Sequence, residues 1–271
     1  MTESAKNAAK IIAQKAPGFK PQLAMTLGSG LGDLAELLEN PIKIPYADLP
    51  DFPPCTVSGH AGNLFLGKLN GLPVACLQGR AHFYEGISTV VAKTYIRTMK
   101  LLGCESILLT NAAGSMREHI VPGDLVLIRD HINFQFTSVL AGHNDNEFGE
   151  RFIGMEDAYD LPLREKLLSI AHKLDIQLHS GVYFGVLGPV FETPAEINCF
   201  KIMGGDVVAM SLINEVVTAR HCGMRVAAIS AVSNMAAGMS DEKLSHDVTL
   251  SGVKLATDKL KKLVLSFVSN Y

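Results

Sequence analysis

The segment GPVFETPAE, residues 188–196, marks the junction of a strand and a helix. The apolar, β-rich residues just before it predict a buried strand, and Thr193 with Glu196 forms the pattern of a capping box at a helix start. Phe191 and Glu192 are therefore expected at a strand end, the edge where open α/β sheets bind ligands. An aromatic ring and a carboxylate there suit a flat heterocycle with ring N–H groups, although a packed Phe191 and a solvated Glu192 would also fit the pattern.

Outward from this junction, strand-like apolar runs alternate with helical patterns. That order predicts an α/β fold with a largely parallel or mixed sheet, and we find no repeat or linker that would divide residues 1–271 into separate domains. The long irregular segment Phe134–Tyr159 is expected to be functional or to lie at an interface. The expected strands are Leu23–Leu27, Leu64–Leu69, Val74–Gln78, Ile107–Thr110, Leu125–Ile132, Val182–Leu187, Val207–Met210 and Val226–Ser230. The expected helices are Glu3–Lys15, Leu31–Leu38, Thr89–Leu102, Leu163–Leu174, Pro194–Met203, Ile213–His221 and Asp247–Val268.

The composition restricts the class of protein. With 271 residues and 48% hydrophobic content, the chain has ample material for a core. A net charge of −3 without a basic cluster argues against a nucleic-acid partner. The five cysteines are scattered, which indicates reduced thiols in a cytoplasmic protein. No segment has the apolar length of a membrane span, so no membrane partner is expected.

The segment GSGLG, residues 28–32, follows an expected strand and opens an expected helix. Glycines there allow backbone N–H groups to approach an anion, and Ser29 adds a hydroxyl donor. The spacing misses the dinucleotide fingerprint because Asp33 stands where the third glycine is required. The segment predicts either a phosphate site or an ordinary turn.

Another cluster of polar residues, GRAHFYEG at residues 79–86, also follows a strand. Arg80 can bind a phosphate through two parallel hydrogen bonds, and His82 and Tyr84 share one side of an extended chain. A salt-bridged structural corner is the alternative.

Two later strand ends carry further candidates. Ser211 precedes an expected helix and can donate to an anion there. Asn234 has a donor and an acceptor on one amide, the pair needed to read N7 and O6 of a 6-oxopurine, although a turn role is equally consistent with the pattern.

Together, GSGLG, GHAG, GRAHFYEG, TNAAGS, GPVFETPAE, DVVAMS and ARHCG, followed by Asn234, resemble the trimeric purine nucleoside phosphorylase family in order and spacing from about Leu23 to His246. The resemblance implies cleavage of a purine nucleoside by inorganic phosphate, which is a co-substrate, with no cofactor and no metal. It also implies a single-domain α/β/α sandwich with a mixed, barrel-like central sheet, and a homotrimer in the cytoplasm.

The same resemblance assigns roles to individual residues. Asn234, Glu192 and His82 would be catalytic. Phosphate would be bound by Ser29, His60, Arg80, His82, the backbone N–H of Ala112, and Ser211. The nucleoside would be bound by Tyr84, Tyr183, Phe191, Glu192, Met210, Asn234 and His246, with Phe152 reaching the neighbouring subunit's site.

Glu192 and Asn234 indicate 6-oxopurines such as inosine and guanosine, because the related methylthioadenosine phosphorylases have an aspartate at the position of Asn234. The sequence departs from the common family pattern at Ser233, and residues 235–245 resemble bacterial members that include xanthosine users. A methylthioadenosine-type phosphorylase, a nucleoside hydrolase, a dehydrogenase and a non-catalytic nucleoside-binding protein are the alternatives. A hydrolase would have no use for an anion site.

Overall fold

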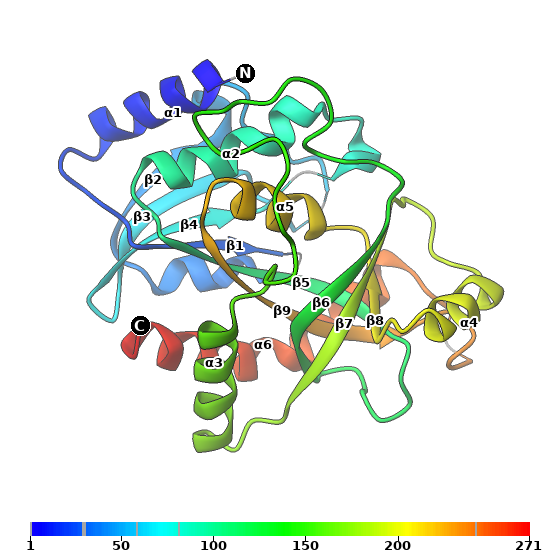
Figure 1. The fold of residues 1–271 in the computed structure, drawn as a ribbon. Coiled ribbons are helices and arrows are strands. Elements are labelled where there is room, and N and C mark those ends of the chain that lie inside the picture. Colours follow the sequence, from blue (N-terminus) through cyan, green and yellow to red (C-terminus); the bar gives the residue numbers. More distant parts are fainter. Residues whose placement is uncertain (1, 29–30, 58, 81, 242) are drawn as a thin grey trace.

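The structure is a computed structural model that describes residues 2–28, 31–57, 59–80, 82–241 and 243–271 as a layered α/β arrangement (Figure 1). The strands are β1 (Leu23–Leu27), β2 (Glu39–Pro45), β3 (Asn63–Leu69), β4 (Leu72–Gln78), β5 (Ser106–Ser115), β6 (Leu125–Phe134), β7 (Leu178–Val186), β8 (Val207–Ala209) and β9 (Arg225–Met235). The α-helices are α1 (Thr2–Lys15), α2 (Thr89–Leu101), α3 (Leu161–Lys173), α4 (Pro194–Ile202), α5 (Ile213–His221) and α6 (His246–Ser269). Short 3-10 helices occur at η1 (Gly32–Leu37), η2 (Tyr46–Asp48) and η3 (Phe83–Glu85).

The strands of the described residues form one mixed sheet in the order β2-β3-β4-β1-β5-β8-β7-β6-β9. Because β9 also pairs with β5, the strands β5, β8, β7, β6 and β9 close into a ring. Within that ring β5 and β9 run parallel, whereas β6 and β9 run antiparallel. The expected mixed, barrel-like sheet is therefore confirmed.

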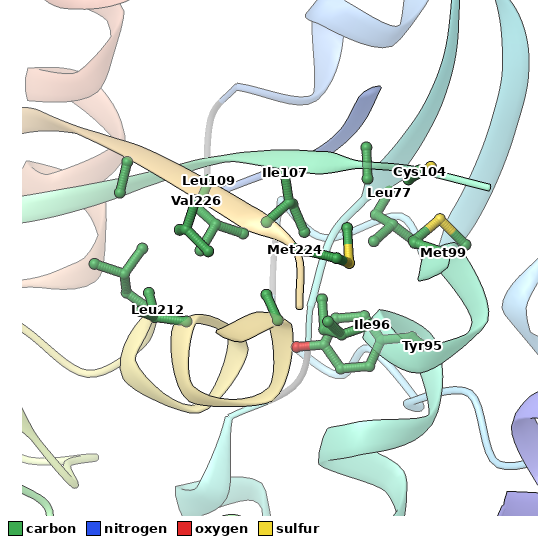
Figure 2. Close-up of a cluster of buried hydrophobic side chains, with 14 of the residues drawn as sticks. Leu77, Tyr95, Ile96, Met99, Cys104, Ile107, Leu109, Leu212, Met224 and Val226 are labelled. Carbon is green, nitrogen blue, oxygen red and sulfur yellow. The ribbon is translucent and has the colours of Figure 1, made fainter. Parts of the chain in front are cut away.

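Helices cover both faces of the sheet, and the strand sequence explains why. Successive side chains of a strand point to opposite faces, and every residue of β1 is buried. Ala24 packs into the core that includes residues of α1, α2 and α5, part of which is drawn in Figure 2. Leu23 and Met25 pack into the other core, with residues of α3 and α6. The predicted α/β/α layers are confirmed, as Figure 1 also shows.

Two strands extend further than the sequence pattern predicts. β5 continues through the expected loop residues to Ser115, and β9 continues to Met235. The pairing register shifts there, from Ala113 opposite Val232 to Gly114 opposite Asn234, so β9 has one extra residue at this point. Such a bulge changes the direction of the side chain that follows it. Asn234 is a residue of the strand β9 and does not lie in a turn.

Other differences are local. β2 was not predicted, because this sheet-edge strand is mostly exposed and contains two prolines, a composition that edge strands tolerate. The expected helix Leu31–Leu38 is the short 3-10 helix η1.

The capping box that begins α4 is present as predicted, with the Thr193 hydroxyl accepting from the Glu196 backbone and the Glu196 carboxylate accepting from the Thr193 backbone.

The long segment after β6 has no helix or strand between residues 135 and 160, as expected. None of the helices in the described ranges combines the length and apolarity that a membrane crossing requires. The prediction of one domain over residues 1–271 stays a prediction, although a single sheet shared by β1 to β9 is consistent with it.

Candidate active site

A cavity of about 350 Å³ opens where the ends of β4, β5, β8 and β9 meet the loop after β7. Most of the predicted site residues border it, although they are spread over the whole chain. These residues are His60, Arg80, His82, Tyr84, Ala112, Phe191, Glu192, Met210, Ser211, Asn234 and His246. Ser29 lies outside the described residues, and Tyr183 and Phe152 do not line the cavity.

Arg80 provides the positive charge of the cavity and is only 2% exposed. Its Nη1 donates to the carbonyl oxygen of Thr110 over 2.7 Å. Its Nε lies 2.8 Å from Oε2 of Glu215, which makes an ion pair. The two atoms do not have the geometry of a hydrogen bond. Nη2 is buried and has no hydrogen-bond partner among the described residues. A buried guanidinium with one unused nitrogen is suited to an anionic ligand.

Gly28 explains how Arg80 can sit so deep. A Cβ atom on Gly28 would lie 2.7 Å from Cα of Asn111, 2.8 Å from the carbonyl oxygen of Thr110 and 3.2 Å from Nη1 of Arg80. Only a residue without a side chain allows the end of β1 to pass this close to β5. The first glycine of GSGLG therefore has a packing role next to the Arg80 site.

Two histidines stand beside Arg80. Nδ1 of His60 lies 2.9 Å from the backbone nitrogen and 2.8 Å from the carbonyl oxygen of Arg80, so either tautomer ties the ring to that main chain. Burial, with the neighbouring Arg80 and His82, lowers the pKa of His60 to about 4. His60 is therefore a neutral ring near pH 7.

His82 is oriented by a carboxylate that the sequence reading did not single out. Oε1 of Glu85 lies 2.9 Å from Nδ1 of His82 and accepts from the His82 backbone over 2.7 Å. Burial alone would raise the pKa of Glu85, but hydrogen bonds from His82 and Thr56 outweigh it and hold the pKa at about 2. Because Glu85 stays ionised, Nδ1 of His82 donates to it, and Nε2 is left for another partner. The ring also stacks on Tyr84, with centroids 4.7 Å apart.

Ser211 stands just before α5, and Tyr183 determines its backbone position. The Tyr183 hydroxyl donates to the carbonyl oxygen of Ser211 over 2.9 Å and accepts from its N–H over 3.0 Å. Tyr183 is fully buried, so it supports Ser211 from behind instead of facing a base in the cavity. The expected position of Tyr183 at the nucleoside is corrected here, because the inward face of β7 buries its ring in the core.

Asn234 is 4% exposed and its amide is partly engaged. Oδ1 accepts from the Ser233 hydroxyl over 2.6 Å, and Nδ2 donates to the carbonyl oxygen of Met235 over 3.0 Å. These two contacts fix the amide plane and its flip state, and they leave the second N–H of Nδ2 for a ligand. Ser233 is thus a residue of the site that the sequence reading named only as a departure from the family pattern.

The loop after β7 forms part of the cavity wall. Gly188 there has a positive φ of 76°, and a Cβ on it would lie 2.4 Å from Sδ of Met210, so the loop packs directly on Met210. Phe191 is 40% exposed, and its ring borders the cavity. Burial of its carboxyl raises the pKa of Glu192, which is half-buried.

Two predicted residues occupy more open positions. His246 is the first residue of α6, is exposed, and borders the cavity together with Thr249, one helical turn away. Phe152 lies in the long loop and is 87% exposed. It does not reach the cavity of its own chain.

The cavity is lined by two groups of residues with different chemistry, which we call its anion end and its base end. One end gathers the buried cation Arg80, the rings of His60 and His82, and the hydroxyl-bearing Ser211. The other end offers the exposed face of Phe191 and the hydrogen-bonding groups of Glu192 and Asn234. An anion and a flat heterocycle can therefore be bound within one cavity.

Comparisons with known proteins agree with this geometry. The sequence model of the Phosphorylase superfamily matches residues 22–269. The chain is 46% identical to Purine nucleoside phosphorylase 1 of Bacillus subtilis over 271 residues, covering 100% of both chains. Isoform 2 of purine nucleoside phosphorylase from Schistosoma mansoni, in complex with cytosine and ribose-1-phosphate, has 39% identity and a TM-score of 0.94, covering 98% of this chain and 96% of that chain. Schistosoma mansoni purine nucleoside phosphorylase in complex with inosine has 36% identity and a TM-score of 0.94, covering 99% and 96%.

A match over nearly the whole chain, at this identity and with the same fold, identifies the family. The chain belongs to the Phosphorylase superfamily and, within it, to the purine nucleoside phosphorylases.

Proposed function

We propose that this protein cleaves 6-oxopurine ribonucleosides and deoxyribonucleosides with inorganic phosphate, releasing the free purine and (deoxy)ribose 1-phosphate. Inosine and guanosine are the expected substrates, with xanthosine as a further candidate. One observation carries the proposal: a single cavity is bordered by Arg80 and also by Glu192 and Asn234. A relative that is 36% identical binds inosine, which supports this choice of base.

The anion end would hold phosphate below the sugar. A phosphate oxygen forms a bond to C1′ while the C1′–N9 bond breaks, and its electron pair stays on the purine. The developing positive charge on the sugar is offset by the phosphate, which is itself held by Arg80, Ser211 and the backbone N–H of Ala112. His60 and His82 would complete this shell, with His82 kept in place by Glu85.

The base end would stabilise the negative charge that develops on the leaving purine. The free N–H of Asn234 can donate to O6 or N7, and that bond strengthens as charge accumulates. Glu192 would accept from the N1–H edge, and Phe191 would stack on the ring. These groups read a 6-oxopurine because a 6-aminopurine lacks the N1–H and offers a donor where O6 accepts.

The sugar would lie between the two ends. Tyr84 and Met210 border the same cavity, and the exposed His246 also borders it and would reach the 5′-hydroxyl. The contact between the 188–192 loop and Met210 would couple base binding to sugar binding.

A nucleoside panel with and without phosphate tests the proposal. Purified protein is incubated with inosine, guanosine, xanthosine, adenosine and methylthioadenosine, and free base and sugar 1-phosphate are quantified. We expect phosphate-dependent release from the 6-oxopurine nucleosides. Preference for the amino nucleosides would indicate a methylthioadenosine-type phosphorylase, and release without phosphate a hydrolase. Tight nucleoside binding without any product would indicate a binding protein, so each of these results contradicts the proposal.

We further propose that the reaction needs inorganic phosphate as a co-substrate but no cofactor and no metal. The charges of the transition state are offset by phosphate and by protein donors in the mechanism above. Dialysis against a chelator should therefore leave turnover unchanged, and restoration of a lost rate by added divalent metal would contradict this.

The assembly is proposed to be a homotrimer in the cytoplasm. Phe152 is large, apolar and exposed on the long loop, which suits a residue that reaches a neighbouring subunit's cavity. All five cysteines are unpaired, which suits a reducing compartment. Light scattering after size-exclusion chromatography should give three times the chain mass, and a monomer with full activity would contradict the shared site.

A further inference from the structure

We propose that Glu215 is a positioning residue of the anion site, which holds the Arg80 guanidinium so that one nitrogen edge is left for phosphate. Tyr95 completes this support from α2. The inference rests on the proposed function in one respect, namely that Arg80 binds the phosphate.

The geometry of Arg80 divides its three nitrogens between protein and ligand. Nη1 is used by the carbonyl oxygen of Thr110, and Nε faces the Glu215 carboxylate. The guanidinium is planar and rigid, so holding two of its nitrogens determines the direction of Nη2. Nε and Nη2 both lack a hydrogen-bond partner among the described residues, but Nε already faces the Glu215 carboxylate, so Nη2 is the nitrogen that we assign to phosphate in the cavity that Arg80 borders.

Water cannot replace Glu215 as the partner of the Arg80 guanidinium, because both side chains are buried. The Glu215 side chain is 3% exposed and that of Arg80 is 2% exposed, so the pair is closed off from water. A buried pair of this kind costs desolvation, and removing one member leaves an uncompensated charge. Its placement behind a ligand site is therefore better explained by positioning than by net stabilisation.

Tyr95 of α2 adds a second contact to the same carboxylate. Burial, together with the neighbouring negative charge of Glu215, raises the pKa of Tyr95 well above its ordinary value, so the hydroxyl keeps its proton beside that carboxylate. Figure 2 shows the Tyr95 hydroxyl directed towards α5 from the neighbouring core. Tyr95 and Arg80 therefore both act on the charge of Glu215 within the core.

The start of α5 connects Glu215 to the other expected phosphate ligand. Glu215 is the third residue of α5, and Ser211 stands two residues before the helix. Between them Leu212 has a φ of 72°, and the Ile213 N–H donates to the carbonyl oxygen of Ser211 over 2.9 Å. This tight turn ties the backbone of Ser211 to the helix that carries Glu215. The positions of Arg80 and Ser211 are therefore both determined by the start of α5.

The test compares Glu215→Gln with a matched pair elsewhere. Gln keeps the shape of the side chain but removes its charge. The control is Asp145→Asn, which breaks another buried ion pair, that of Asp145 with Arg97 of α2. Neither of these two residues lines the cavity. Tyr95→Phe is a milder second variant that leaves the Arg80–Glu215 pair intact.

We expect Glu215→Gln to raise KM for phosphate about tenfold, the scale of one charge-assisted hydrogen bond, with KM for inosine within about twofold. Tyr95→Phe should shift the phosphate KM in the same direction by a smaller factor. Asp145→Asn should lower the melting temperature without changing the phosphate KM.

An unchanged phosphate KM in Glu215→Gln, or equal increases in the phosphate and inosine KM values, would overturn the proposal. If the wild type shows no phosphorolysis, the proposed function fails separately. Calorimetric titration with inorganic phosphate then decides, because weaker binding by Glu215→Gln or, should that variant not fold, by Tyr95→Phe supports the positioning role, and equal binding overturns it.

Discussion

The two ends of the cavity are built in different ways. At the anion end, His60, Arg80 and His82 are 7%, 2% and 9% exposed, and each is held by main-chain or carboxylate partners. At the base end, Phe191 is 40% exposed and Glu192 is carried on a loop. The anion end is organised before any ligand arrives, whereas at the base end Asn234 is fixed in advance but the loop that carries Phe191 and Glu192 depends more on the ligand for its final packing. Substitutions should therefore have larger effects at the first end than at the second.

The largest effect is expected for Arg80→Ala. Loss of the cation should lower kcat/KM about 10³-fold, the upper range for removing one charge-stabilising donor. The free energy of unfolding should also fall by about 3–5 kcal/mol, because Glu215 is left as a buried charge without its partner. Steady-state kinetics and urea denaturation measure the two effects. Arg80→Ala combined with Glu215→Ala should recover part of the stability but none of the activity, and recovered activity would argue against a phosphate contact.

Asn234→Ala should come next, with kcat for inosine reduced about 10²-fold. The donor acts mainly on the charge of the departing purine, so KM for phosphate should change little. Initial rates over a matrix of inosine and phosphate concentrations separate the two constants. Unchanged inosine turnover would remove Asn234 from the mechanism.

Titration of Glu192 should make the inosine KM depend on pH in the acidic range. Burial raises its pKa, so as pH falls the carboxylate that accepts from N1–H is lost earlier than for an ordinary glutamate. Below that raised pKa the inosine KM should rise about tenfold per pH unit, because one proton must leave for binding. The same proton binds the folded state more tightly than the unfolded state, so in that window stability should rise as pH falls.

Glu192→Gln is the control for this pH effect. It cannot titrate, so its inosine KM should be higher near neutral pH but flat across the acidic range. A pH profile identical to that of the wild type would assign the titration to another group.

The smallest effect is expected at Phe191. Phe191→Leu removes a stacking surface worth about 0.5–1.5 kcal/mol, which corresponds to an inosine KM several-fold higher with kcat nearly unchanged. Because the ring is already partly exposed, the folded state should lose little stability. A loss as large as that of Arg80→Ala would show that the two ends do not differ as proposed.

The sequence predicted the strands that have a local apolar pattern better than the strand segments that depend on pairing with distant residues. β1 was predicted with its observed bounds, because a short apolar run between turn signals is a local pattern. The edge strand β2 was missed, since its prolines and exposed charges carry no such pattern. The extension of β9 past Ser230 was missed because pairing with β5, not local composition, keeps residues 231–235 in the sheet.

Within the site, the residues that the motifs name were mostly brought together, and the residues behind them were not foreseen. Glu85 could have been found, since it stands three residues after His82 in the same segment. Glu215 gave no signal, because it comes from a helix far along the chain and meets Arg80 only across the core. Tyr183 was expected at the base and instead supports Ser211.

The sequence by itself determined which chemical groups stand at each strand end, because periodicity, glycine positions and helix caps are local properties of the chain. The tertiary structure alone decided which of those ends meet and which way each side chain faces. The closure of β9 onto β5, the bulge before Asn234 and the buried pair of Arg80 with Glu215 all depend on contacts between distant segments. Such contacts are selected by packing and by the need to satisfy buried polar groups, and neither is recorded in the local order of residues.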